Sequence, residues 1–340
     1  MKKIIIIILS FIVFFLPLRI VYAVNTSAES YVLMDMDSNR VLDEKDKDKR
    51  MLTASIAKIM TLLVAIKYGD LNEYVTITRE DLNQEGSKAY IDVNEEVKLE
   101  DLLYALILRS GNDAANAIAR AVGGNVSNFV YLMNEEAKEI GMKNTTFENP
   151  SGLDSSSKNY STAYDMALLT SYAYNFPEFR KFFEATNYTV TSKSGKTYPF
   201  EGKHRLVNQK GIYLGGKTGF TKAARRTLVT TAKKDGVRLV VVTLNDPNDW
   251  EDHERLFEYG FSSYTNKTIL KAQVLKQNEL MLDYLVALKH DIILPLKEGE
   301  EVKLEFYIKE NPDVDAGYVL IYVDDELVKK EALYPKNTKL

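Results

Sequence analysis

The stretch SIAKIMTLLVAIKYG, residues 55–69, is almost entirely apolar after its first turn and is long enough for four helical turns. Gly69 is a typical residue to end such a helix. A helix that is apolar on all sides is expected to be buried. Ser55 and Lys58 are three residues apart, so they share one face at the positive end of this helix, with Cβ atoms roughly 5–6 Å apart. The stretch therefore predicts a buried helix that begins with a neighbouring hydroxyl and amine.

This pair is a candidate nucleophile and base. A lysine with the ordinary pKa of about 10.4 is protonated at neutral pH and cannot accept a proton. Burial lowers the pKa, and a second cation nearby lowers it further. Two ordinary roles compete with this interpretation: Thr53 or Ser55 as a helix cap, and Lys58 as a lysine that reaches the surface. The apolar neighbours of Lys58 argue against a surface lysine.

A second small polar motif, Ser110-Gly111-Asn112, separates two predicted helices at residues 99–109 and 113–122. A polar turn between two buried helices can direct a hydroxyl and an amide into a shared cleft. Taken alone, the motif is better explained as a connector capped by Ser110 and Asp113.

The third motif, Lys217-Thr218-Gly219, precedes two alternating strand-like runs at 226–232 and 237–244. Asp235-Gly236 between these runs is a strong hairpin signal. The motif is therefore expected on a strand of an antiparallel meander, where glycine permits close approach of a ligand. Lys217 is the candidate second cation, which stays charged and holds an anionic substrate while Lys58 is neutral.

Similar short strings occur elsewhere by chance. Ser155-Ser156-Ser157-Lys158 and Ser157-Lys158-Asn159 lie in a polar segment that has nothing to desolvate a lysine, and Lys193-Ser194-Gly195 is expected at the tip of a small hairpin. The local context therefore favours Ser55, Ser110 and Lys217 over these copies.

The three motifs in this order resemble those of the serine-type D-alanyl-D-alanine carboxypeptidases, also called low-molecular-mass penicillin-binding proteins, of the β-lactamase/transpeptidase-like superfamily. The resemblance runs from about residue 30 to residue 264 and also includes Tyr31-Val32-Leu33-Met34-Asp35 and Glu148-Asn149-Pro150-Ser151-Gly152-Leu153. It implies an α+β fold in which helices flank both faces of an antiparallel sheet, with a helical subdomain.

The resemblance also implies an activity. A family member removes the terminal D-alanine from peptidoglycan pentapeptide stems, takes part in cell-wall biogenesis and cell shape, and is acylated by β-lactams. It needs no cofactor and no metal. Its partners are stem peptides that end in D-Ala-D-Ala and β-lactam inhibitors.

Carried over by position, the resemblance gives each motif a role. Ser55 forms the acyl-enzyme and Lys58 activates it, while Ser110 and Asn112 relay protons and hold the substrate amide. The third motif, with Gly219 at its end, binds substrate, and the oxyanion hole uses backbone N–H groups of Ser55 and of the residue after the motif. The substrate-binding residues are Lys217, Thr218, Gly219 and Phe220.

Two features leave alternatives open. Many family members have an arginine near the position of Asp252 that helps to hold the substrate carboxylate, and here Arg225, Arg226 or Arg255 can substitute. A β-lactamase of class A shares the three motifs but carries E-x-x-L-N between the second and the third, which is absent here. The alternatives to the carboxypeptidase are thus a β-lactamase-like hydrolase and a non-hydrolytic penicillin-binding scaffold.

Composition agrees with an exported two-domain enzyme. The chain has 340 residues, no cysteine, three scattered histidines and a formal net charge of −4, so thiol chemistry is excluded and neither a metal site nor nucleic-acid binding is indicated. Residues 1–23 are predicted to be a signal peptide, 24–264 the catalytic domain, and 265–340 a small all-β domain. The protein is thus expected outside the cytoplasm, secreted or at the cell surface. Membrane association is expected only if the N-terminal segment stays uncleaved.

Overall fold

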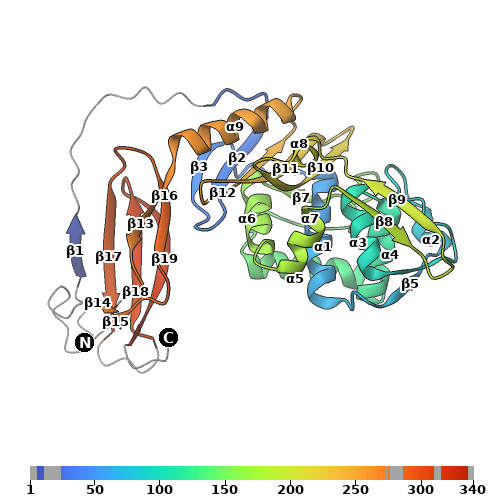
Figure 1. The fold of residues 1–340 in the computed structure, drawn as a ribbon, viewed down its shortest axis with the longest axis horizontal. Helices are drawn as coiled ribbons and strands as arrows, with labels where there is room; N and C mark the ends of the chain where they lie inside the picture. Colours follow the sequence, from blue (N-terminus) through green and yellow to red (C-terminus); the bar gives the residue numbers. More distant parts are fainter. Residues whose placement is uncertain (1–5, 11–23, 273, 276–285, 310–314, 336–340) are drawn as a thin grey trace. The chain divides into compact units, whose positions relative to one another are not determined.

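The structure is a computed structural model that describes residues 6–10, 24–272, 274–275, 286–309 and 315–335. Its contacts divide the chain into two compact units. The large unit consists of Ala23–Met36 and Val41–Glu258, and the small unit includes Asp37–Arg40 and the described residues from Tyr259 onward. Figure 1 shows the elements of each unit.

An antiparallel five-stranded sheet is the centre of the large unit. Its inner strands are buried on both faces, because helices cover both sides. The predicted Asp235-Gly236 hairpin is confirmed, and both residues have positive φ. The strands, in sheet order, are β10 (Tyr213–Thr221), β11 (Arg225–Lys234), β12 (Val237–Leu244), β2 (Ser30–Asp35) and β3 (Val41–Lys45).

Helices lie on both faces of this sheet (Figure 1). On one face α6 (Ala163–Ala173) packs on β2 and β12, and α7 (Pro177–Phe183) packs near β10. On the other face α9 (Asp249–Ser263) is held through His253, which hydrogen-bonds to Thr230 of β11 and Thr243 of β12. The expected α+β fold is confirmed.

The predicted buried helix forms from a 3₁₀ turn, η1 (Ala54–Ala57), and α1 (Lys58–Tyr68), which ends at Gly69. Its residues from Lys58 to Ala65 are all buried. It packs in a helical cluster with α3 (Leu99–Leu108), α4 (Asn112–Gly123) and α5 (Val126–Ile140), so the two helices predicted around Ser110-Gly111-Asn112 are confirmed.

Shorter elements complete the large unit. They are β4 (Met51–Leu52), β5 (Tyr74–Thr76), α2 (Arg79–Leu82), β6 (Glu96–Lys98), β7 (Tyr160–Ser161), β8 (Asn187–Thr191), β9 (Thr197–Glu201) and α8 (Arg205–Gln209).

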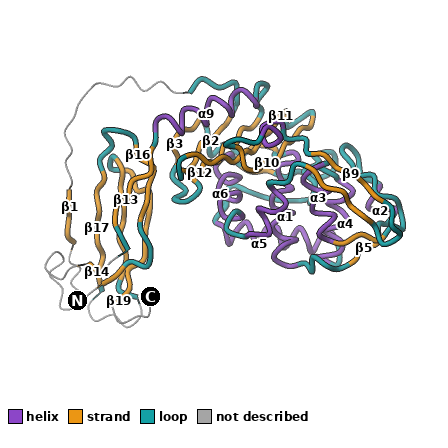
Figure 2. The backbone as a smooth tube through the Cα atoms, in the orientation of Figure 1, coloured by secondary structure: helices purple, strands orange, loops and turns teal. Residues whose placement is uncertain are grey.

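The small unit is built from strands, and from residue 265 onward its described part contains only strands and loops (Figure 2). Alternate residues of β18 are buried, as expected for a sheet with one covered face. The first two strands after residue 264 are short, at 265–270 and 274–275. The strands are β1 (Ile6–Ser10), β13 (Thr265–Leu270), β14 (Val274–Leu275), β15 (Val286–Ala287), β16 (Ile292–Leu296), β17 (Val302–Ile308), β18 (Gly317–Val323) and β19 (Glu326–Pro335).

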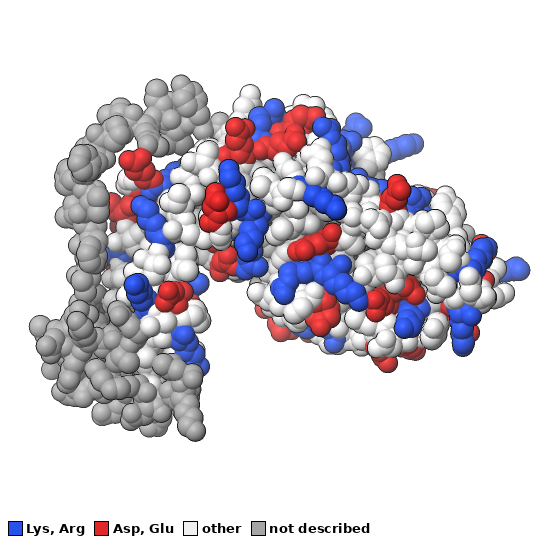
Figure 3. Space-filling view, viewed as in Figure 1, with Lys and Arg blue, Asp and Glu red and all other residues white. Residues whose placement is uncertain are grey.

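Most of the predicted signal peptide, residues 1–5 and 11–23, lies outside the described residues, and residues 6–10 pair with β17 as β1. Among the helices that the structure describes, none has the length and apolar character to cross a bilayer. On the face shown in Figure 3, acidic and basic side chains are interspersed.

Candidate active site

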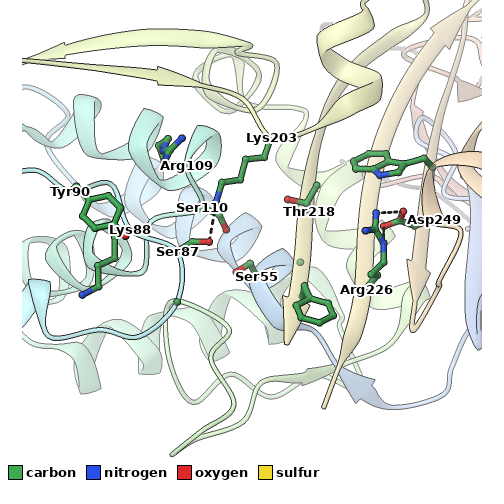
Figure 4. Close-up of a pocket in the computed structure, with 14 residues that line it drawn as sticks. Ser55, Ser87, Lys88, Tyr90, Arg109, Ser110, Lys203, Thr218, Arg226 and Asp249 are labelled. Atoms are coloured by element: carbon green, nitrogen blue, oxygen red, sulfur yellow. Dashed lines mark hydrogen bonds and ion pairs between the residues drawn. The ribbon is translucent and has the colours of Figure 1, made fainter. Parts of the chain in front are cut away.

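A cleft of about 680 Å³ in the large unit is lined by residues of all three motifs. Ser55 comes from η1, Ser110 from the turn between α3 and α4, and Thr218 from β10. Figure 4 shows these side chains converging on one opening. The fold therefore brings together residues that are more than 150 positions apart in the sequence.

Ser55 and Lys58 are in direct contact, as their spacing predicts. The Ser55 Oγ and the Lys58 Nζ are 3.1 Å apart, and the Lys58 side chain is fully buried. Burial, and then the neighbouring Lys217, hold the pKa of Lys58 well below its ordinary value. Lys58 is therefore suited to act as a base.

Two carbonyl oxygens fix the Lys58 amine in place. Its Nζ donates to the Asn112 Oδ1 at 2.7 Å and to the backbone oxygen of Ser151. A neutral amine has only two N–H groups, so these two acceptors leave its lone pair for the Ser55 hydroxyl. Asn112 is itself oriented by its Nδ2, which donates to the backbone oxygen of Glu85 at 2.6 Å.

Lys217 occupies the other half of the site. Its Nζ donates to the Ser110 Oγ at 2.9 Å and to the backbone oxygen of Thr218 at 2.7 Å, and its side chain is buried. Burial, and then Lys203, lower the pKa of Lys217 to about 7. Ser110 has a φ of +57°, which is uncommon for a residue with a side chain and turns its hydroxyl toward Lys217. Ser110 thus links the second motif to the third.

The turn that carries Ser55 is held from two sides. On one side the Thr227 Oγ1 of β11 donates to the backbone oxygen of Thr53 at 2.9 Å. On the other side Gly152 packs so closely that a Cβ there would lie 1.8 Å from the Ala54 oxygen. A Cβ on Gly219 would lie 3.0 Å from the Ser55 nitrogen, so β10 passes directly beside the nucleophile. Phe220, the next residue of β10, lines the cleft and its side chain is 62% exposed.

The similar strings lie outside the cleft. Ser155 and Lys158 are exposed in a loop, and Lys193-Ser194-Gly195 forms the turn between β8 and β9, as predicted. Local hydrophobic context thus separated the motifs in the cleft from the chance copies.

Of the three arginines left open by the sequence, one lines the cleft. The Arg226 Nε donates to the Asp249 Oδ2 at 3.0 Å, beside Trp250. Arg255 instead pairs with Asp252, and Arg225 is exposed outside the cleft lining. Arg226 is the cross-strand partner of Phe220, two positions beyond Thr218 on β10.

Sequence reasoning missed two contributions. The Asn149-Pro150-Ser151-Gly152 segment was part of the family resemblance. The contact of the Ser151 carbonyl with Lys58 was not predicted, because a backbone oxygen is not indicated by any side-chain type. Lys203, between β9 and α8, lines the cleft and had no signal. In the described part of the chain, no group of three or more His, Cys, Asp or Glu side chains is arranged to hold a metal ion.

Comparisons with known proteins show similarity to one family of enzymes. The family of D-alanyl-D-alanine carboxypeptidases matches residues 19–248. The D-alanyl-D-alanine carboxypeptidase DacF of Bacillus subtilis is 30% identical over 302 residues, covering 84% of this chain and 77% of DacF. Among solved structures, penicillin binding protein 5 of Haemophilus influenzae superimposes with a TM-score of 0.76 at 27% identity, covering 92% of this chain and 97% of that one. A mutant of the Streptomyces K15 DD-transpeptidase gives 0.66 at 29% identity, covering 70% of this chain and 99% of that one.

Proposed function

Because this chain belongs to the D-alanyl-D-alanine carboxypeptidase family and is a serine-type hydrolase of that class, we propose that Ser55 is its nucleophile and Lys58 the base that activates it. The substrates are peptidoglycan peptides, and β-lactams are inhibitors that bind the same site. One observation carries the proposal: the Lys58 amine is 3.1 Å from the Ser55 hydroxyl, and its N–H groups are bound by Asn112 and Ser151.

Acylation then proceeds in a defined order. The Ser55 proton moves to the Lys58 Nζ while the Oγ bonds to the carbonyl carbon of the penultimate D-alanine. The resulting oxyanion is stabilised by the backbone N–H groups of Ser55 and Phe220, each typically worth about 3–4 kcal/mol. A proton delivered through Ser110 reaches the leaving nitrogen, the C–N bond breaks, and D-alanine departs. Water then hydrolyses the ester and restores Ser55.

The terminal carboxylate of the substrate is held at the β10 side of the cleft. Thr218 lines the cleft there, and the Lys217 ammonium lies behind it. We assign Arg226 as the third group, because Asp249 fixes its guanidinium beside this strand. A bound carboxylate stabilises the protonated form of Lys217 and so raises its pKa above the value of about 7 in the free enzyme.

Peptidoglycan lies outside the cytoplasm, and the site of action of this protein is therefore extracytoplasmic. The proposed route is export through residues 1–23 with cleavage after Ala23, supported by the Met1-Lys2-Lys3 start and the apolar run that follows. We also propose that residues 24–264 form the catalytic domain and 265–340 a separate β-rich domain.

The direct test measures D-alanine released from diacetyl-L-Lys-D-Ala-D-Ala, together with covalent labelling by fluorescent penicillin. Ser55→Ala is expected to abolish both. Ser155→Ala is the matched control, because it removes a hydroxyl from a similar motif in an exposed loop, and it is expected to change neither. Labelling retained by Ser55→Ala contradicts the site assignment. Penicillin hydrolysed faster than the peptide favours a β-lactamase-like enzyme.

A further inference from the structure

Two cations lie near each other in the lining of the cleft. Arg109 is at the C-terminal end of α3, and Lys203 lies between β9 and α8. Lys203 is exposed at the mouth of the cleft, where its Nζ donates to the Ser87 Oγ at 3.0 Å. Partial burial and the nearby Arg109 both lower the pKa of Lys203, so the two charges repel each other.

No carboxylate in the described cleft lining compensates these charges. Among the lining residues only Asp249 is acidic, and Arg226 already pairs with it. Within the described part of the chain, the Arg109 guanidinium forms neither a hydrogen bond nor an ion pair. Lys88 also lines the cleft, but its ammonium donates to the Leu82 backbone oxygen and points away in Figure 4. A chain of net charge −4 thus keeps two adjacent unpaired cations at its active site, where a bound anion would relieve their repulsion.

The position of these cations indicates which part of a substrate they meet. In Figure 4, Arg109 and Lys203 are on the opposite side of β10 from Arg226 and Asp249. The terminal carboxylate of the substrate belongs to the Thr218 and Arg226 side. The part of the peptide that stays bonded to Ser55 therefore extends toward the wall that carries Arg109 and Lys203.

We propose that Arg109 and Lys203 form an anion subsite for a second carboxylate of the stem peptide, on the side chain of the residue that precedes D-Ala-D-Ala. That residue is a diamino acid, and meso-diaminopimelate differs from lysine there by one carboxylate at the end of the side chain. The subsite selects diaminopimelate stems over lysine stems. This inference rests on the proposed function, because it uses the same nucleophile and the same direction of binding.

The test compares kcat/KM for two pentapeptides that differ only in lysine or meso-diaminopimelate at the third position. The wild-type enzyme is expected to prefer the diaminopimelate peptide by about tenfold, the effect of one charge-assisted contact. Arg109→Gln and Lys203→Gln are each expected to reduce this ratio toward one. Added salt should reduce the ratio in the wild type as well. The control is Lys222→Gln, which removes an exposed charge next to the cleft without touching its lining and should leave the ratio unchanged.

The possible results separate the two proposals. If the wild type cleaves both peptides equally well, or if the variants lower kcat/KM for both by the same factor, the subsite is refuted while the carboxypeptidase assignment stands. If the wild type releases D-alanine from neither peptide and is not labelled by penicillin, the proposed function fails and the subsite with it. Circular dichroism of each variant checks that a changed ratio does not come from misfolding.

Discussion

Lys58 and Lys217 have the same side chain, and their protonation differs because their neighbours differ. Lys58 faces two carbonyl oxygens and the Ser55 hydroxyl, a set that accommodates a neutral amine. Lys217 faces the Ser110 hydroxyl and the Thr218 carbonyl, and it gains a negative partner only when a substrate carboxylate binds. Mutual repulsion between the two buried amines favours a single proton shared by the pair.

This arrangement predicts a bell-shaped dependence of kcat/KM on pH. Lys58 must be neutral, so activity falls as pH drops through its depressed pKa. Lys217 must be protonated to bind the carboxylate, so activity falls as pH rises through about 7. Steady-state assays from about pH 5 to about pH 10 measure both limbs of this pH profile. A substrate with a C-terminal amide is the control, since it should lack the alkaline limb; the same alkaline limb for both substrates contradicts the role of Lys217.

Replacing Lys217 by alanine tests the same role without a pH change. Lys217→Ala should lower kcat/KM for a free-carboxylate peptide by about 10- to 100-fold, because a hydrogen bond to a charged group is lost. The loss for the amidated peptide should be much smaller. Equal losses would show that Lys217 acts in catalysis or folding and not in binding the carboxylate.

At the scale of elements, the backbone around the nucleophile depends on one glycine. Gly152 has a φ of +82°, and a Cβ there would lie 1.8 Å from the Ala54 oxygen. The neighbouring Ser151 supplies the carbonyl that holds Lys58, so any shift of this turn also moves the base.

Gly152→Ala is therefore expected to slow acylation by penicillin by about 100-fold, the effect of a shift near 1 Å at a reacting group. Gly236→Ala is a matched control, because Gly236 has a φ of +83° and no atom within 4 Å of the added Cβ. It should cost only the strain of the left-handed backbone, about 1–2 kcal/mol in the free energy of unfolding, and leave acylation unchanged. The measurements are the acylation rate and the urea unfolding curve of each variant. Similar acylation rates for the two variants would show that the close contact of Gly152 with Ala54 does not matter for acylation.

Elements defined by local pattern were predictable, and those defined by distant contacts were not. The apolar run of α1 and the Asp-Gly hairpin of β11 and β12 carry their own periodicity and turn signals, and both are confirmed. By contrast β13 is an exposed, polar strand that forms because it pairs with β16, so no alternation marks it. The same reason explains the site: Ser55, Lys58 and Lys217 belong to motifs, whereas the ion pair of Arg226 with Asp249 depends on how two segments meet.

At the scale of the whole molecule, the described residues form two separate hydrophobic cores. One includes α1, α3 and the inner strands of the large unit, and the other is formed by buried side chains of the small unit such as Phe306, Val319 and Ile321. Because each core excludes water on its own, each unit has the main source of stability of an independent domain.

Two cores predict two unfolding transitions in differential scanning calorimetry, and only one of them should respond to penicillin. The acyl group on Ser55 contacts the large unit alone. The midpoint temperature of the large unit's transition should therefore rise by about 2–4 °C for each kcal/mol of added stability. The midpoint temperature of the small unit's transition should not change. Ser55→Ala provides the control, because without the acyl bond the shift should disappear. A single transition that moves as a whole would mean that the two cores unfold as one cooperative unit.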